Sequence, residues 1–141
     1  MKMQVKEIGI GKAVDAIIED GKGNIVLIKR KYPPFKDYYA LPGGAIEKGE
    51  KTKDALIREV KEETNLTIKI IKKIGVYDEP GRDPRGKIQS TAFKCSIVGL
   101  VSDMKSGDDA KEVELVPKEK LKEIDLAFDH RKMLKDANVL K

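Results

Sequence analysis

The sequence predicts a single α/β domain in which strands and two main helices pack as a sandwich. Three observations support this class. The chain has 141 residues, 40% of them hydrophobic, which suits one domain with a sizeable core. Segments in which apolar and polar residues alternate are mixed with segments of helical spacing. Six prolines and twelve glycines mark turns, but no repeat or low-complexity tract indicates a linker to a second domain.

The first elements are predicted to be two strands joined in a hairpin. Residues 14–18 and 25–31 are rich in apolar and β-branched side chains. The segment between them, residues 21–24, contains two glycines and reads as the hairpin turn. Residues 32–44 continue the chain as a turn-rich loop with a short strand, which leads into the first helix.

Residues 54–64 predict that helix, with Thr52 as its N-cap. Glu59, Glu62 and Glu63 are three or four residues apart, so their carboxylates share one helix face. This face is largely turned away from the apolar stripe of the helix. The stripe consists of Ala55, Leu56, Ile57 and Val60.

The second half of the chain is predicted to contain three more strands and two helical segments. In chain order these elements are the strand 67–77, a polar loop at 78–86, the strands 87–98 and 112–116, a helix or turn opened by Pro117 at 119–121, and a last helix at 127–135. The single cysteine, Cys95, cannot form an intramolecular disulfide. Because it lies in an alternating strand, we predict a buried thiol without a catalytic role.

The charge distribution argues against a nucleic-acid partner, and the distribution of apolar residues argues against a membrane span. The net charge is +5, but the lysines are scattered among glutamates, and no basic stripe with interleaved aromatic residues is present. A positive balance also attracts small polyanions such as nucleotides. No run approaches the roughly 18 apolar residues of a membrane span, and the first residues lack a signal-peptide core. We therefore expect a cytoplasmic protein.

The three carboxylates on one helix face repel one another. Such a cluster is tolerated if the carboxylates are solvated on a surface helix, if some pKa values rise, or if a divalent metal ion neutralises them. Oxygen ligands favour a hard ion, so Mg²⁺ fits this cluster better than zinc, with Mn²⁺ as the alternative ion. Mg²⁺ also binds substrate phosphates together with carboxylates. If a metal ion neutralises this cluster, we therefore expect Mg²⁺ or Mn²⁺, and a solvated helix face stays the alternative.

Residues 41–44, Leu-Pro-Gly-Gly, predict a tight turn ahead of the helix, and glycines there let the backbone approach a phosphate or metal closely. Arg58 is predicted to point off the acidic face and to pair with Glu50 by a charge-assisted bond. Both residues are scaffold candidates, together with Gly44. Asn65 follows the helix, where asparagine is the common substitute for a left-handed glycine.

The spacing of these residues resembles the Nudix box, the signature of the Nudix hydrolases. In chain order the matching residues are Gly44, Glu50, Arg58, Glu59, Val60, Glu62 and Glu63. Only the last glycine of the pattern differs, because Asn65 stands there. A match at so many spaced positions is a specific signal. The resemblance implies the Nudix α/β/α sandwich with a mixed β-sheet, as one domain over residues 1–141.

The resemblance also implies the metal ligands and the reaction. Glu59, Glu62, Glu63 and the backbone carbonyl of Gly43 would bind Mg²⁺, which bridges the pyrophosphate and lowers the pKa of a bound water. That water would attack one phosphorus of a nucleoside diphosphate linked to another moiety.

Two groups of residues are candidates for the catalytic base. It is either a box glutamate, Glu62 or Glu63, or an acid of the loop 106–112, where the family often places one. In that loop Glu112 is the first choice and Asp108 and Asp109 follow. The alternative for the loop acids is a solvated acidic surface.

Substrate identity depends on residues outside the box. Pro80 lies fifteen residues beyond Asn65, which is a mark of the ADP-ribose pyrophosphatase branch. Residues 81–86 and 126–130 are also similar to segments of small archaeal and bacterial members. The branch implies hydrolysis of ADP-ribose to AMP and ribose 5-phosphate, and many of its members are homodimers. We therefore expect a nucleotide-sugar or nucleotide substrate. The residues themselves do not decide the oligomeric state, and the resemblance adds a homodimer as one option.

Four side chains are candidates for substrate contact. Arg82 and Arg85 would offer guanidinium groups to a pyrophosphate or terminal ribose, unless they form a solvated turn in which an arginine pairs with Asp83. Tyr39 or its neighbour Tyr38 would place a ring against an adenine, with core packing as the alternative.

Phe128 faces the same choice between substrate and core. His130, the only histidine, is expected to have a structural role at a helix start, with substrate contact as the alternative.

Two rival functions stay open. The same box serves nucleoside triphosphate pyrophosphohydrolases that remove oxidised dGTP. In another class, a Nudix-like domain senses ADP-ribose without cleaving it. Such sensors tend to lose box acids, whereas this chain keeps Glu59, Glu62 and Glu63.

Overall fold

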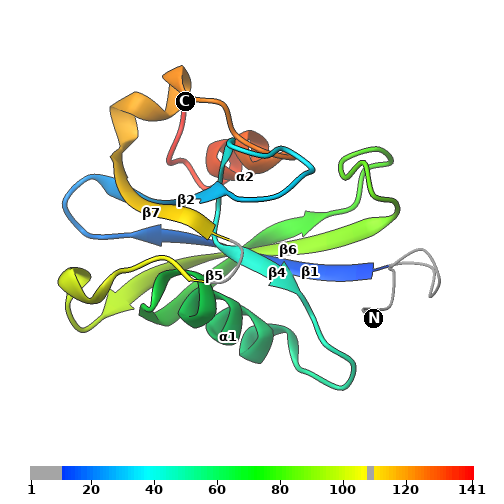
Figure 1. The fold of residues 1–141 in the computed structure, drawn as a ribbon, viewed down its shortest axis with the longest axis horizontal. Coiled ribbons are helices and arrows are strands. Elements are labelled where there is room, and N and C mark those ends of the chain that lie inside the picture. Colours follow the sequence, from blue (N-terminus) through cyan, green and yellow to red (C-terminus); the bar gives the residue numbers. More distant parts are fainter. Residues whose placement is uncertain (1–10, 108–109) are drawn as a thin grey trace.

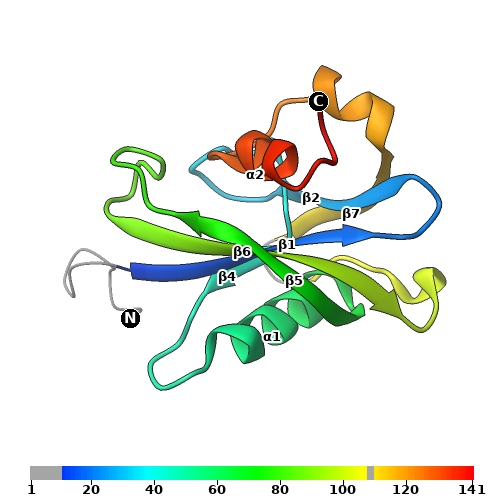
Figure 2. The same cartoon turned by 180° about the vertical axis from the view of Figure 1, so that it is seen from behind.

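The structure is a computed structural model that describes residues 11–107 and 110–141. Within these residues, seven strands form one mixed sheet, helix α1 (Thr52–Thr64) covers one face and helix α2 (His130–Asp136) covers the other. Figure 1 shows α1 below the sheet and α2 above it, and Figure 2 shows the same layers from behind. The predicted α/β/α sandwich with a mixed sheet is confirmed.

The strands follow the order β3-β2-β1-β6-β5, with β4 on β1 and β7 on β2. Their bounds are β1 Gly11–Glu19, β2 Asn24–Arg30, β3 Tyr39–Ala40, β4 Gly43–Ala45, β5 Thr67–Tyr77, β6 Ile88–Val98 and β7 Ala110–Pro117. Two 3₁₀ helices, η2 (Val101–Asp103) and η3 (Lys118–Glu123), flank β7. The pairing of β1 with β6 is parallel and the other pairings are antiparallel. The predicted hairpin of β1 and β2 is confirmed.

Two apolar clusters fill the two faces of the sheet. Leu56 and Val60 of α1 pack with Ala16 of β1 in one cluster. Met133 of α2 packs with Ile17 of the same strand in the other. Successive side chains of a strand point to opposite faces, so each strand contributes to both clusters. Burial of these side chains, at roughly 25 cal/mol per Å² of apolar surface, fixes both helices against the sheet.

Two details of α1 differ from the prediction. Lys51 is the N-cap, since its carbonyl accepts from the Ala55 N–H at 2.9 Å, so the prediction of Thr52 as N-cap was wrong. Ile57 is 41% exposed and does not belong to the buried stripe. It follows Leu56 by one residue, about 100° around the helix, and therefore points away from the sheet.

The last helix starts later than predicted. It begins at His130, because Phe128 has a left-handed φ of 51° that a right-handed helix does not allow. Cys95 is buried, as predicted, and burial raises the pKa of its thiol to about 12. In the described part of the chain, no helix is both long and apolar enough to cross a bilayer.

Candidate active site

A pocket of about 350 Å³ opens where α1, the 41–44 turn and the end of β2 meet. Its volume lies in the range of about 300–1,000 Å³ that is usual for small-molecule sites. The pocket brings together predicted site residues that are far apart in the sequence. These are Gly43, Gly44, Glu59, Glu63, Arg82, Arg85 and Phe128.

The two glycines of the turn allow a close approach between β4, β1 and α1. Pairing of β4 with β1 places Gly43 opposite Asp15, and a Cβ on Gly43 would overlap a carbonyl oxygen of β1. A Cβ on Gly44 would lie 2.5 Å from Oε1 and 2.6 Å from Oε2 of Glu59. No real Cβ approaches an oxygen so closely. The backbone of β1 therefore requires glycine at position 43, whereas a side chain at position 44 would force the Glu59 carboxylate to move. The Glu59 carboxylate lies directly against Gly44.

Glu63 is bound to the same turn. It is only 6% exposed, and its Oε1 accepts the Gly43 N–H at 2.9 Å. A buried carboxylate is costly unless it is hydrogen-bonded or paired. The backbone of the turn thus compensates for part of the cost of burying Glu63 and fixes its position.

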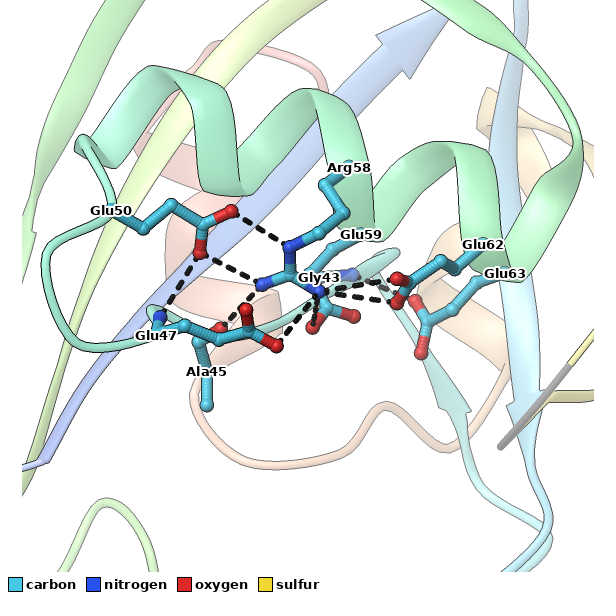
Figure 3. A network of polar contacts seen from close by, with 8 residues as sticks. All are labelled: Gly43, Ala45, Glu47, Glu50, Arg58, Glu59, Glu62 and Glu63. Atoms are coloured by element: carbon cyan, nitrogen blue, oxygen red, sulfur yellow. Dashed lines mark hydrogen bonds and ion pairs between the residues drawn. The ribbon is translucent and has the colours of Figure 1, made fainter.

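Arg58 lies at the centre of the acidic network, as Figure 3 shows. Its Nε donates to Glu50 at 2.7 Å, which confirms the predicted pair. This bond, with a backbone N–H of the loop, lowers the pKa of Glu50 to about 2. Arg58 does not point off the acidic face, however, because its Nη1 donates to Glu59 at 3.0 Å and to Glu62 at 3.2 Å. The long side chain reaches carboxylates one and four residues further along the helix.

The donor chemistry of the pocket fits a hard divalent ion. Within residues 11–107 and 110–141, no three Asp, Glu, His or Cys side chains are arranged to hold a metal ion. In this arrangement the guanidinium of Arg58 supplies the positive charge beside Glu59 and Glu62. Glu59 and Glu63 nevertheless offer carboxylate oxygens to one pocket, in the cradle beside Gly44 that any Cβ would fill. Oxygen ligands of this kind suit Mg²⁺ or Mn²⁺.

Three guanidinium groups surround the ring of Phe128 in the same pocket. Their central carbons lie 5.1 Å (Arg30), 5.4 Å (Arg85) and 5.9 Å (Arg82) from its centroid. The left-handed φ of Phe128 is a strained conformation for a bulky residue, and such residues cluster at binding sites. The sites of substrate contact predicted at Arg82, Arg85 and Phe128 are therefore next to one another.

The two predicted arginines differ in the solvent exposure of their side chains. Arg82 is 5% exposed and donates to both oxygens of Asp129, at 2.9 and 2.6 Å. Arg85 is 51% exposed and pairs with Asp83 at 2.8 Å, which is the local pairing considered as the alternative. Asp83, by contrast, is buried, so a move of Arg85 toward a ligand would leave a buried carboxylate with fewer partners. Arg82 is held in place.

The sequence of the whole chain agrees with this geometry. The NUDIX domain family matches residues 9–137. The chain belongs to the Nudix family. An ADP-ribose pyrophosphatase of Methanocaldococcus jannaschii is 50% identical over 125 residues, covering 88% of this chain and 70% of that protein. This chain is therefore a Nudix pyrophosphohydrolase, and Nudix hydrolases use divalent metal ions.

Solved structures show the same Nudix fold. A bifunctional NMN adenylyltransferase/ADP ribose pyrophosphatase of Francisella tularensis has a TM-score of 0.80 and 29% identity. The match covers 89% of this chain but 39% of the Francisella chain, so this chain spans less than half of that protein. The NUDIX domain of Shewanella oneidensis NrtR, solved with ADP ribose, has a TM-score of 0.79 over 98% of this chain and 88% of that one. Its 22% identity supports the fold alone.

Other predicted residues of this Nudix site lie outside the pocket lining. Glu62 is exposed beside Arg58. Glu112 pairs in register with Lys29 of β2, and its neighbour Val113 packs in the α1-side cluster. Strand alternation therefore directs Glu112 to the opposite face from α1. Tyr39 donates to Glu114 at 3.1 Å and packs against the α2-side core.

The remaining predicted site candidates are two loop acids and one tyrosine. Asp108 and Asp109 lie outside the described residues. Tyr38 is exposed and contacts Phe35 edge-on at 5.3 Å between ring centroids. Glu112 as the base and Tyr39 as an adenine contact thus stay predictions.

The pocket also contains polar residues that sequence reasoning missed. Asp15, Ser90 and Arg30 line it, and the first two are buried. Asp15 carried a usable signal, since it is an acid inside an apolar strand, where an unpaired charge is costly. Ser90 and Arg30 carried none, because each fits an ordinary strand.

Asn65, the departure from the Nudix box, has a function of its own in the structure. Its φ of 64° confirms the left-handed cap, and its Nδ2 donates to the carbonyl oxygen of Asp103 at 2.8 Å. The same loop covers the end of α1, where the N–H of Lys105 donates to the Thr64 carbonyl at 3.0 Å. A glycine could adopt the same φ but could not make the side-chain bond. Asn65 therefore joins the helix end to the loop.

We expect Asn65→Gly to destabilise the protein by about 1 kcal/mol, the usual net value of one hydrogen bond. Chemical denaturation measures this change. Asn138→Gly is a matched control, because Asn138 has a φ of 61° without a side-chain hydrogen bond among the described contacts. Equal destabilisation by the two substitutions would show that the bond to Asp103 contributes nothing.

Proposed function

We propose that this protein hydrolyses ADP-ribose with Mg²⁺ to give AMP and ribose 5-phosphate. The observation that carries the proposal is the composition of the pocket between α1 and the 41–44 turn. It combines the carboxylates of Glu59 and Glu63 with the guanidinium of Arg85 and the ring of Phe128. A pyrophosphate with an organic group on each side needs both sets of contacts. The identity with the archaeal ADP-ribose pyrophosphatase supports this substrate.

The proposed reaction adds one water across the pyrophosphate. The water oxygen forms a bond to one phosphorus, the bridging P–O bond breaks, and the leaving oxygen remains on the other phosphate. Glu59, Glu62, Glu63 and the carbonyl of Gly43 would hold Mg²⁺. When bound, Mg²⁺ would lower the pKa of a coordinated water and neutralise phosphate charge.

The chain's own groups prepare the site for this reaction. Gly44 lets the substrate and Glu59 approach each other, and Arg58 holds Glu50 so that the loop stays against α1. Arg85, which is exposed at the pocket, would bind the pyrophosphate or the terminal ribose. Between the two sources of the base, we propose Glu63, because it lines the pocket and Glu112 is directed to the other face of the sheet.

A substrate panel tests this function. Purified protein is incubated with Mg²⁺ and ADP-ribose, NADH, a diadenosine polyphosphate or 8-oxo-dGTP, and the products are separated. We expect ADP-ribose to have the highest kcat/KM and to yield AMP. A 41% match over 64 residues to a putative 8-oxo-dGTP diphosphatase of Bacillus subtilis makes the triphosphate the main competitor. Preference for 8-oxo-dGTP, with release of pyrophosphate, would refute the proposal.

The same experiment separates an enzyme from a sensor. An ADPR responsive transcriptional repressor of Acinetobacter baylyi is 28% identical over 85% of this chain, and this chain covers 48% of it. Tight binding of ADP-ribose without turnover, under saturating Mg²⁺ or Mn²⁺, would favour a sensor. Assembly as a homodimer stays a prediction, which light scattering tests. The lack of a nucleic-acid partner also stays a prediction, which gel-shift measurements test.

A further inference from the structure

His130 is buried at the first residue of α2, and both of its ring nitrogens face polar groups. It is 2% exposed. The backbone N–H of Leu41 donates to Nδ1 at 3.0 Å, and Nε2 lies 3.3 Å from Oδ1 of Asp15. An amide N–H can only donate, so Nδ1 is the unprotonated nitrogen and Nε2 carries the hydrogen that faces Asp15. Because Leu41 occupies the lone pair of Nδ1, the ring is not placed to accept a proton from a reacting water.

The bond from Leu41 fixes the turn that carries the two glycines. Leu41 lies between β3 and β4, and Pro42 has no N–H, so Leu41 provides the last amide donor before Gly43. The carbonyl of Pro42 accepts from a backbone N–H of β1 at 2.8 Å. Gly43 then donates to Glu63. The turn is therefore held by α2, by β1 and by α1, and His130 is the contribution of α2.

Two buried residues, Asp15 and Ser90, support His130 on the side of its Nε2 atom. Ser90 of β6 donates to Oδ2 of Asp15, while Oδ1 of the same carboxylate faces His130. The carboxylate thus accepts from both sides and fixes the tautomer of the ring. Asp15 also packs under Gly43.

We propose that His130 is a positioning residue that holds the 41–44 turn close to α1. It thereby sets the positions of Glu59 and Glu63 for a divalent metal ion. The two side-chain contacts of His130 have separate consequences. The Leu41 bond holds the turn, and the Asp15 contact orients the ring. Loss of the Leu41 bond lets the turn move away from α1, whereas loss of the Asp15 contact alone does not.

Three substitutions separate these contacts. His130→Asn puts an amide oxygen near the place of Nδ1, so it keeps an acceptor for Leu41 and loses the donor to Asp15. His130→Gln puts an amide nitrogen near the place of Nε2, so it keeps the donor and loses the acceptor. His130→Ala loses both. The His130→Asn and His130→Ala variants both lack the donor to Asp15 and differ in the acceptor for Leu41. This comparison remains decisive if the His130→Gln variant folds poorly.

The first measurement is Mn²⁺ binding, read from the electron paramagnetic resonance signal of free Mn²⁺. We expect His130→Ala and His130→Gln to weaken binding by about tenfold to a hundredfold, the usual effect of removing a group that supports metal ligands. His130→Asn is expected to stay within about threefold of the original chain. Turnover of ADP-ribose should follow the same order, with the loss in kcat and little change in KM.

A control separates this effect from loosening of α2. Tyr77→Phe removes the bond from the Tyr77 hydroxyl to Asp136 of α2, at 2.7 Å, without contact to the turn. It should lower the melting temperature and leave Mn²⁺ binding unchanged. The proposal is wrong if the His130→Asn and His130→Ala variants bind Mn²⁺ equally, or if the His130→Gln variant binds it as tightly as the original chain does. The turnover readout rests on the proposed function, but Mn²⁺ binding does not, so failure of one is distinguishable from failure of the other.

Discussion

Glu63→Gln is expected to lower kcat by about a hundredfold to a thousandfold at saturating Mg²⁺, equivalent to about 3–4 kcal/mol of transition-state stabilisation. Glutamine keeps the size of the side chain and an oxygen that can accept the Gly43 N–H, so the local fold should persist. It removes the negative charge that would bind the metal and accept a proton. Steady-state turnover of ADP-ribose across a Mg²⁺ titration measures the effect.

Glu112→Gln is the matched comparison for Glu63→Gln. Both remove one carboxylate charge, but Glu112 is exposed and lies on the opposite face of the sheet from α1. If Glu63 is the base, only its substitution abolishes turnover. Near-normal turnover of the Glu63 variant at saturating Mg²⁺, with a large loss in the Glu112 variant, would assign the base to Glu112 at the start of β7. Equal melting temperatures for the two variants would exclude unfolding as the cause.

The elements of the fold follow from local sequence patterns. The period of the apolar residues predicts α1 and the long strands, because burial on one face selects the same period in sequence and in structure. The errors lie where the local pattern is ambiguous. Ile57 is apolar but points away from the sheet, and Phe128 delays α2 through a left-handed φ. Neither feature changes the spacing of apolar residues along the sequence, so this spacing could not predict either one.

The candidate site divides in the same way between local and distant contacts. Glu59, Glu62 and Glu63 lie on one helix, so their spacing alone predicts a shared face. By contrast, Leu41 and His130 are 89 residues apart, and Ser90 and Asp15 are 75 apart. These contacts depend on which strands become neighbours in the sheet. A period along one segment carries no information about that arrangement, so the support of the 41–44 turn could be found only in three dimensions.

Gly44→Ala should lower kcat by about a hundredfold, although alanine adds only a methyl group. The new Cβ would lie 2.5 Å from Oε1 of Glu59, so this carboxylate must move. A displacement of about 1 Å at a catalytic group costs about 10²-fold in rate. Gly75→Ala is the matched control, since its Cβ would meet the Tyr77 ring at 3.4 Å, an ordinary contact. Kinetics and Mn²⁺ binding of the two variants measure the difference.

A double-mutant cycle tests whether the Gly44→Ala effect acts through Glu59. Glu59→Asp shortens the side chain by one methylene and withdraws the carboxylate from the position of the new Cβ. If the clash is the cause, Gly44→Ala should cost much less in the Glu59→Asp background than in the original chain, because neighbouring residues that share one contact are not additive. Full additivity would mean that the methyl group blocks substrate directly. In that case the cradle beside Gly44 would be a phosphate contact and not the place where Glu59 is held for the metal.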